Sequence, residues 1–175
     1  MPDRVIPLLE AEAADLLWAE EIGPATLALI EEARHTLRIG MFILAAAVDD
    51  DRGGRVRELL DAVVRAARRG VDVRVLVDAF EPEQDPYNVN LIAAHVLLDG
   101  GVPVRVYRDG YRSSLHSKVV VNERRALVGS GNWSAGGLLA NVEAAVLVES
   151  EGVSGQLIAA MGWAWNDAEA MEPLP

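Results

Sequence analysis

Two short polar segments in the second half of the chain combine residue types that are needed for phosphate chemistry. The first is His116-Ser117-Lys118 and the second is Gly129-Ser130-Gly131-Asn132. An imidazole can act as a nucleophile or as a general acid near neutral pH. A lysine supplies a positive charge for phosphate oxygens, while serine and asparagine supply neutral donors where negative charge develops. The combination predicts attack on a phosphate ester by His116, assisted by Lys118, Ser130 and Asn132.

Two predicted strands position these side chains. Residues 117–122 are rich in β-branched side chains, which favours a strand. Alternation along it places His116 and Lys118 on one face. A second apolar run, 126–128, ends at a glycine-rich turn whose free N–H groups can approach an anion. We therefore expect Gly131 to contribute to substrate binding and Asn132 to lie close to the histidine and the lysine.

The order of these residues resembles a known motif. His-x-Lys followed about a dozen residues later by Gly-Ser-x-Asn is similar to the HKD motif of the phospholipase D superfamily. Asn141-Val142-Glu143 strengthens the resemblance, because small single-motif bacterial endonucleases of that superfamily carry Asn-x-Glu at a like distance. The resemblance covers roughly residues 25–165. One position departs from it, because the motif's usual Asp is absent and its spacing assigns either Asn122 or Glu123 to that place.

The resemblance implies a two-step reaction that needs no metal and no cofactor. One histidine attacks phosphorus to form a phosphohistidine, and a second histidine protonates the leaving group. Since this chain carries one such histidine, the resemblance implies a symmetric homodimer in which His116, Lys118 and Asn132 of both subunits meet. We expect a nuclease acting on nucleic-acid phosphodiesters, with a single strand favoured because a narrow shared cleft suits one strand better than a duplex.

Three further residues have two interpretations each. Glu143 is predicted to point inward from an apolar strand, where a partner such as the His116 ring would offset its burial and fix the imidazole tautomer. The alternative is a surface acid at a strand end. Trp133 either stacks on a base or acyl chain of the substrate or packs within the protein. Arg112 is either a phosphate contact or a solvated loop charge.

Composition limits the class of protein. A chain of 175 residues is expected to form one domain, and without cysteines it has neither disulfides nor thiolate metal sites. The net charge of −11 argues against tight, non-specific binding of nucleic acid over the whole surface, but it permits a basic cleft. No apolar run approaches the ~20 residues of a membrane span, so we expect no stable membrane insertion. The N-terminus lacks the pattern of a signal peptide, which predicts a cytoplasmic protein.

The hydrophobic pattern predicts an α/β fold. Periodicity indicates helices at 25–35, 54–69, 88–98 and 152–168, and strands at 37–44, 71–77, 102–107, 117–122, 126–128 and 142–149. With the resemblance, this corresponds to a phospholipase D-like α/β/α sandwich with a mixed sheet and one HKD motif per chain. We expect a single domain over 1–175, in which residues 1–23 form a helical extension with its helix at 8–21.

Two other functions remain open. A phospholipid phosphodiesterase would share the motif, although the sequence shows no interfacial amphipathic helix with a basic face. A non-catalytic phosphate-binding or dimerisation module is suggested by the missing motif Asp and the acidic composition. The retention of His116, Lys118, Asn132 and Glu143 together opposes that second alternative.

Overall fold

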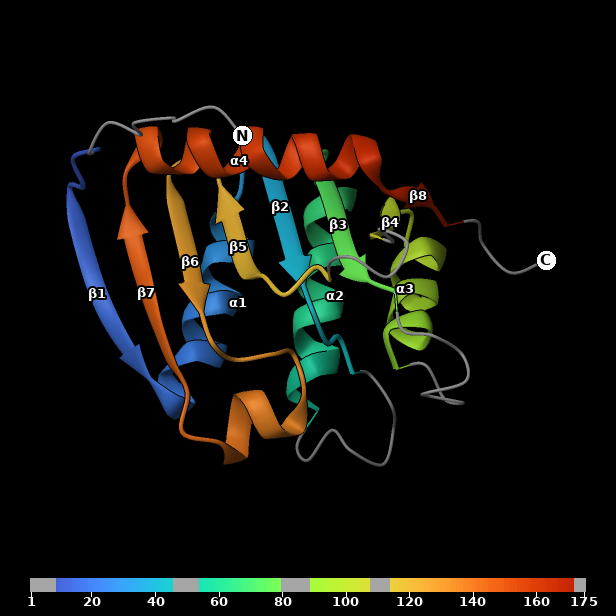
Figure 1. Cartoon of the computed structure of the whole chain (residues 1–175), viewed down its shortest axis with the longest axis horizontal. Coiled ribbons are helices and arrows are strands. Elements are labelled where there is room, and N and C mark those ends of the chain that lie inside the picture. The colour runs from blue at the N-terminus through green and yellow to red at the C-terminus, as the bar shows by residue number, and fades with distance from the viewer. Residues whose placement is uncertain (1–8, 46–53, 80–88, 108–113, 172–175) are drawn as a thin grey trace.

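One mixed sheet of eight strands organises the chain, in the order β1-β7-β6-β5-β2-β3-β4-β8. The computed structural model describes residues 9–45, 54–79, 89–107 and 114–171. Helices α1, α2 and α3 lie on one face of the sheet, and α4 crosses the other face near one end of the strands (Figure 1). The predicted α/β fold with a mixed sheet is therefore confirmed.

The elements alternate in the first half of the chain and form a meander in the second. The strands are β1 (Ala13–Trp18), β2 (Thr36–Met41), β3 (Asp72–Asp78), β4 (Val104–Tyr107), β5 (Lys118–Asn122), β6 (Arg125–Gly129), β7 (Ala144–Glu149) and β8 (Glu169–Ala170). The helices are α1 (Ile22–Glu32), α2 (Arg55–Arg68), α3 (Val89–Asp99) and α4 (Glu151–Asp167), with a 3₁₀ turn η1 (Ala19–Glu21) and a π-helical turn η2 (Gly136–Ala140). Strands β2, β3 and β4 are parallel, and β5, β6, β7 and β1 continue the sheet antiparallel.

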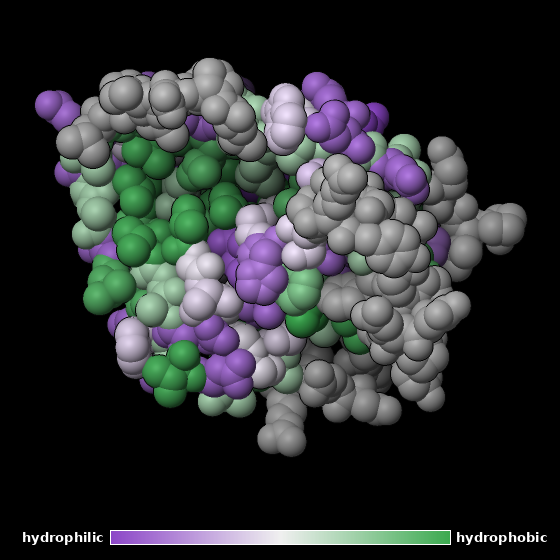
Figure 2. All heavy atoms as spheres, viewed as in Figure 1, coloured by the Kyte–Doolittle hydropathy of each residue, from purple (hydrophilic) through white to green (hydrophobic). Residues whose placement is uncertain are grey.

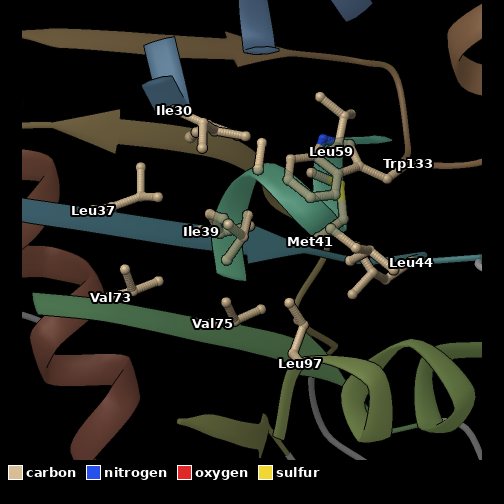
Figure 3. Packing of buried hydrophobic residues seen from close by; sticks show 14 of the residues in the cluster. Ile30, Leu37, Ile39, Met41, Leu44, Leu59, Val73, Val75, Leu97 and Trp133 are labelled. Atoms are coloured by element: carbon tan, nitrogen blue, oxygen red, sulfur yellow. The ribbon is translucent and has the colours of Figure 1, made fainter. Parts of the chain in front are cut away.

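The main core lies between the sheet and helices α1–α3. Alternate residues of β2 and β3, such as Ile39 and Val75, point into it and meet Leu59 of α2 and Leu97 of α3 (Figure 3). A smaller cluster on the opposite face joins β5 and β6 to α4, with Val121 at its centre. Because both faces of the central strands are covered, those strands read in the sequence as continuous apolar runs.

The N-terminal segment differs from its prediction. Residues 13–18 form the edge strand β1. The helix predicted at 8–21, which was to make residues 1–23 a helical extension, is therefore wrong over these six residues. Alanine, glutamate and leucine favour a helix locally, but β7 presents an open edge whose N–H and C=O groups need partners. The register pairs Leu16 with Val146. Residues 1–8 lie outside the described part of the chain.

Among the described residues, a group of apolar side chains is exposed beside α4. Leu16, Trp18, Val128 and Val146 are 71%, 54%, 43% and 40% exposed, and we call these four residues the open apolar face. Leu16 pairs with Val146, and Val146 pairs with Val128, so a row of these side chains crosses β1, β7 and β6. Figure 2 shows apolar residues gathered over this part of the sheet.

Candidate active site

His116 and Lys118 lie in contact, as the strand alternation predicts. Lys118 opens β5 and pairs with Met41 of β2. Its Nζ lies 3.1 Å from Nδ1 and 3.3 Å from Nε2 of His116, and it donates to the His116 carbonyl at 2.9 Å. Lys118 is only 8% exposed, whereas His116 is exposed. The imidazole is therefore accessible and rests on a buried cation.

Phe42 supports both of these groups. Its ring centroid lies 4.5 Å from that of His116 at an interplanar angle of 52°, and the Lys118 Nζ lies 4.9 Å from the Phe42 centroid. The aromatic ring therefore stabilises the lysine charge through a cation–π contact and limits the positions open to the imidazole. Phe42 was missed in the sequence because it continues the apolar run of β2, where a core role is the natural interpretation.

Asn132 is anchored by the segment that follows β2. Its Oδ1 accepts a hydrogen bond from the Ile43 N–H at 3.2 Å. Backbone bonds from Trp133 to Ile43 and from Ala45 to Trp133 join the same two segments. Since the amide oxygen is used by the protein, the amide NH₂ is the part of Asn132 that can donate to a phosphate oxygen.

The residues predicted to bind substrate have different outcomes. Trp133 is 2% exposed and packs in the main core with Leu44 and Leu138, so it cannot stack on a base or acyl chain (Figure 3). Of its two predicted roles, the structure supports packing. Gly131 is buried in the turn beside Glu143. Arg112 lies outside the described residues.

Glu143 has partners other than the expected imidazole. It accepts hydrogen bonds from the Ser130 hydroxyl and from the Asn141 amide, the latter at 3.1 Å. Ser130 Oγ in turn accepts from the Ala144 N–H at 3.2 Å. Among the described residues, the hydrogen bonds of this carboxylate therefore hold the turn after β6 against the start of β7, and none runs to His116. Ser130 is therefore linked to the candidate site by its hydrogen bond to the Glu143 carboxylate.

The electrostatics of the site centre on Lys118. Burial lowers the pKa of Lys118, and the negative charge of Glu143 partly opposes that shift. The cation is thus maintained in a poorly hydrated position, where its interaction with a phosphate is stronger than in water. Within the described ranges, no three His, Asp or Glu side chains are grouped as metal ligands.

Asn122 and Glu123, the two candidates for the position of the missing motif Asp, both have structural roles in this protein. Glu123 accepts backbone N–H bonds from Arg34 at 2.9 Å, Thr36 at 3.2 Å and His35 at 3.4 Å. Burial alone would raise the pKa of Glu123, but these N–H donors outweigh it, and the pKa is lowered. Asn122 accepts from the N–H groups of the β5–β6 turn and donates to α1. Both side chains lie at the end of β5 opposite Lys118.

Two glycines permit the close packing of the site. A Cβ on Gly40 of β2 would lie 2.9 Å from the Oγ of Ser117, which is the residue between His116 and Lys118 in the sequence. A Cβ on Gly137 of η2 would overlap the Asn132 backbone, lying 2.7 Å from its nitrogen. Side chains at these places would displace the segments that carry the histidine and the asparagine.

Comparisons with known proteins identify the family of this chain. The family profile described as cardiolipin synthase, PLD-like domain, matches residues 26–165. The DISARM protein DrmC of Bacillus paralicheniformis is 33% identical over 127 residues, which cover 72% of this chain and 50% of DrmC. Cardiolipin synthase B of Salmonella typhi is 38% identical over 92 residues, which cover 51% of this chain and 21% of that protein. The chain therefore spans half the length, or less, of these curated relatives.

A solved structure shows the same fold. Nuc from Salmonella typhimurium, a phospholipase D family member, superposes with a TM-score of 0.74 at 19% identity, covering 91% of this chain and 99% of Nuc. The family match includes His116, Lys118, Ser130, Asn132 and Glu143. The chain belongs to the phospholipase D superfamily and has the phosphodiesterase fold of its PLD-like domain.

Proposed function

We propose that this protein is a nuclease that hydrolyses nucleic-acid phosphodiesters through a phosphohistidine, with the active site completed by a second copy of the chain. The observation that carries the proposal is the contact between an exposed imidazole and a buried lysine, 3.1 Å apart. The lysine charge and the Asn132 NH₂ group supply donors for the non-bridging phosphate oxygens. An exposed nucleophile beside fixed phosphate donors suits displacement at phosphorus.

The proposed reaction has two displacements. A ring nitrogen of His116 attacks phosphorus, so that an N–P bond forms and the bond from phosphorus to the leaving oxygen breaks. His116 of the partner subunit gives its proton to that oxygen. The same partner imidazole then takes a proton from water, the water oxygen attacks phosphorus, and the N–P bond breaks to restore the free histidine.

The open apolar face supports the second copy. Strand alternation places Val128, Val119 and Gly40 in one cross-strand row, and Phe42 follows Gly40 by two residues. Phe42 itself lies beyond the end of β2 at Met41, where its ring contacts His116, so this row leads from the open apolar face toward the site. A symmetric contact through this face would cover its apolar side chains with those of a second copy.

Nucleic acid is favoured over phospholipid by the helices. No helix in the described ranges is long and apolar enough to cross a bilayer. The helix beside the open apolar face, α4, carries no lysine or arginine, so it lacks the basic face that anionic lipid surfaces attract. The acidic net charge of −11 suits a short single-stranded segment with few phosphate contacts better than a duplex gripped along its length.

The first experiment measures hydrolysis of bis(p-nitrophenyl) phosphate in excess EDTA by wild type and His116→Asn. We expect turnover by the wild type and a loss of at least ~10³-fold in the variant, because the nucleophile is removed. Equal rates in both proteins, or no turnover by a confirmed wild-type dimer, would contradict the proposal.

The substrate class is tested with the same two proteins. A labelled single-stranded oligonucleotide should be cut by the wild type, with a rate that falls as salt is added, while labelled phospholipid in anionic vesicles should remain intact. Cleavage of the lipid alone would replace the nuclease by a lipid phosphodiesterase. A salt-independent rate on the oligonucleotide would also count against a polynucleotide substrate.

A further inference from the structure

Asn90, in the first turn of α3, is a buried amide that the motif does not include. It is 2% exposed. Its Nδ2 donates to the carbonyl of Phe42 at 2.8 Å and to that of Asp78 at 3.1 Å, and its Oδ1 accepts from the Leu44 N–H at 2.7 Å. All three partners are backbone groups, so the side chain uses both of its donor hydrogens and its acceptor to hold the main chain.

These hydrogen bonds lie where two parallel strands stop pairing. The register of β2 and β3 ends at Met41 and Val77, and the chain continues from β2 as residues 42–45, which we call the connecting segment. Beyond that point the ladder of β2 and β3 no longer pairs buried backbone groups, and leaving such groups unpaired costs free energy. Asn90 bridges the gap, because its one amide bonds both to the end of β3 and to the connecting segment.

The connecting segment contacts the histidine and the lysine of the candidate site. The Phe42 N–H donates to the carbonyl of Ser117 at 3.1 Å. The Phe42 ring centroid lies 4.5 Å from that of His116 and 4.9 Å from the Nζ of Lys118. The position of the connecting segment therefore decides where the aromatic ring meets both groups.

Two further hydrogen bonds attach the site to the chain ends that Asn90 joins. Ile43 of the connecting segment donates its N–H to the Oδ1 of Asn132 at 3.2 Å. At the end of β3, the Oδ1 of Asp78 accepts from the N–H of Leu115 at 2.5 Å, and Leu115 is the residue before the histidine. The backbone that carries the imidazole and the amide of Asn132 are thus both tied to segments that Asn90 holds together.

We infer that Asn90 is a positioning residue for the candidate site, because its amide fixes the connecting segment and thereby the Phe42 ring against which His116 lies. The three hydrogen bonds of Asn90 run to backbone groups, so it acts on the imidazole through other residues. The benefit to turnover rests on the proposed function. The contact of the imidazole with the Phe42 ring is present in the free protein and can be measured without substrate.

Asn122 offers a matched control at the end of β5 that lies opposite Lys118. It is also 2% exposed. Its side chain also makes three hydrogen bonds to backbone groups, which are the Leu29 carbonyl at 3.0 Å and the N–H groups of Arg124 and Arg125 at 2.9 Å and 2.8 Å. Alanine at either asparagine therefore removes the same kind of bonds from an equally buried place. A purely structural role for Asn90 predicts the same consequences for both variants.

The test is an NMR titration of the free protein, because the ring current of Phe42 displaces the resonances of the neighbouring imidazole protons. The proteins are the wild type, Asn90→Ala, Asn90→Ser, Asn122→Ala and Phe42→Leu, and His116→Asn assigns the His116 signals. Chemical shifts are compared at the alkaline plateau of each titration, where protonation no longer changes them. Exposed His35 is the internal reference.

In Asn90→Ala we expect the His116 resonances to move from their wild-type position toward that in Phe42→Leu, because the ring is no longer held beside the imidazole. Asn90→Ser should move them in the same direction, since its shorter hydroxyl group cannot reach both strand ends. Asn122→Ala should keep the wild-type resonances although its melting temperature falls by a comparable amount. Turnover of bis(p-nitrophenyl) phosphate by Asn90→Ala should fall at least about tenfold, because a small misplacement of reacting groups is costly.

Three results would overturn the inference. The first is a folded Asn90 variant with wild-type His116 resonances, and the second is an equal displacement of those resonances in Asn122→Ala. The third is a failure of both Asn90 variants to fold while Asn122→Ala folds, which would make Asn90 a residue of folding alone. If the wild type shows no turnover on any substrate, the proposed function fails, while the NMR comparison still decides the role of Asn90.

Discussion

Among the described residues, Lys118 supplies the buried positive charge of the site. It is 8% exposed, and burial lowers its pKa against the opposing influence of Glu143. A lysine in this state loses its proton at a lower pH than a surface lysine. Phosphate binding should therefore weaken as the solution becomes alkaline, at a pH that Glu143 helps to set.

Glu143→Gln is expected to move the alkaline limit of activity to lower pH, by roughly one unit or less. The sign follows because the carboxylate raises the pKa of Lys118, and its removal lets burial lower that pKa further. The measurement is the rate of bis(p-nitrophenyl) phosphate hydrolysis from neutral to alkaline pH. Glu149→Gln, at the other end of β7 where the carboxylate pairs with Arg124, should keep the wild-type limit. An unchanged limit in Glu143→Gln would refute this assignment.

The sequence predicts some residues of the site and not others. The two-residue spacing of His116 and Lys118 along one strand was enough to predict that their side chains lie close together. Phe42 meets the histidine only through the pairing of β2 with β5, which no local spacing contains. The predicted hydrogen-bond partner of Glu143, the His116 imidazole, was wrong for a similar reason. The turn after β6 brings the Ser130 hydroxyl to the carboxylate instead.

Among the elements, the π-helical turn η2 packs directly against Asn132, and it can do so only if Gly137 has no side chain. The Asn132 backbone lies against Gly137, where a Cβ would approach its nitrogen to 2.7 Å. Ser134 Oγ also accepts from the Gly137 N–H at 3.0 Å. The turn can therefore reach its position only with a glycine at this point.

Gly137→Ala is expected to lower turnover at least about tenfold and to cost ~1–3 kcal/mol of stability, because the added methyl group must displace the Asn132 backbone. Gly155→Ala in α4 is the matched control, since a Cβ there meets nothing within 4 Å. That control should keep full activity and gain about 0.5–1 kcal/mol from the better helix propensity of alanine. Thermal melts and turnover on the same samples test both changes, and wild-type turnover in Gly137→Ala would disprove the role of η2.

The elements with strong periodicity were predictable and the edges of the sheet were not. The predicted helix at 54–69 corresponds to α2, whose buried stripe includes Val56, Leu60 and Val63. The strands β1 and β8 take their conformation from β7 and β4, their neighbours in the sheet. Two residues of β8 carry no pattern of their own, so only the completed sheet defines that strand.

At the scale of the whole molecule, the open apolar face is the surface through which we propose that two copies meet. Val146→Glu should convert the dimer to a monomer and abolish activity, because like charges would face each other across the symmetric contact and weaken association roughly tenfold or more. Ile92→Glu on α3 is the matched control, with the same exposure of 40% but a position on a helix of the other layer. Light scattering and turnover at one concentration measure both, and an active monomer would exclude the shared site.

The pairing of β2 with β5 has a consequence for the chain while it is being made. Phe42 and Asp78 leave the ribosome well before His116, and Glu143 follows later still. At a synthesis rate of about 5–20 residues per second, the residues of helices α1–α3 and of the parallel strands are all made before the histidine. The imidazole gains its full surroundings only when β5, β6 and β7 have joined β2. The residues of the candidate site therefore come together only when the last strands of the sheet are in place.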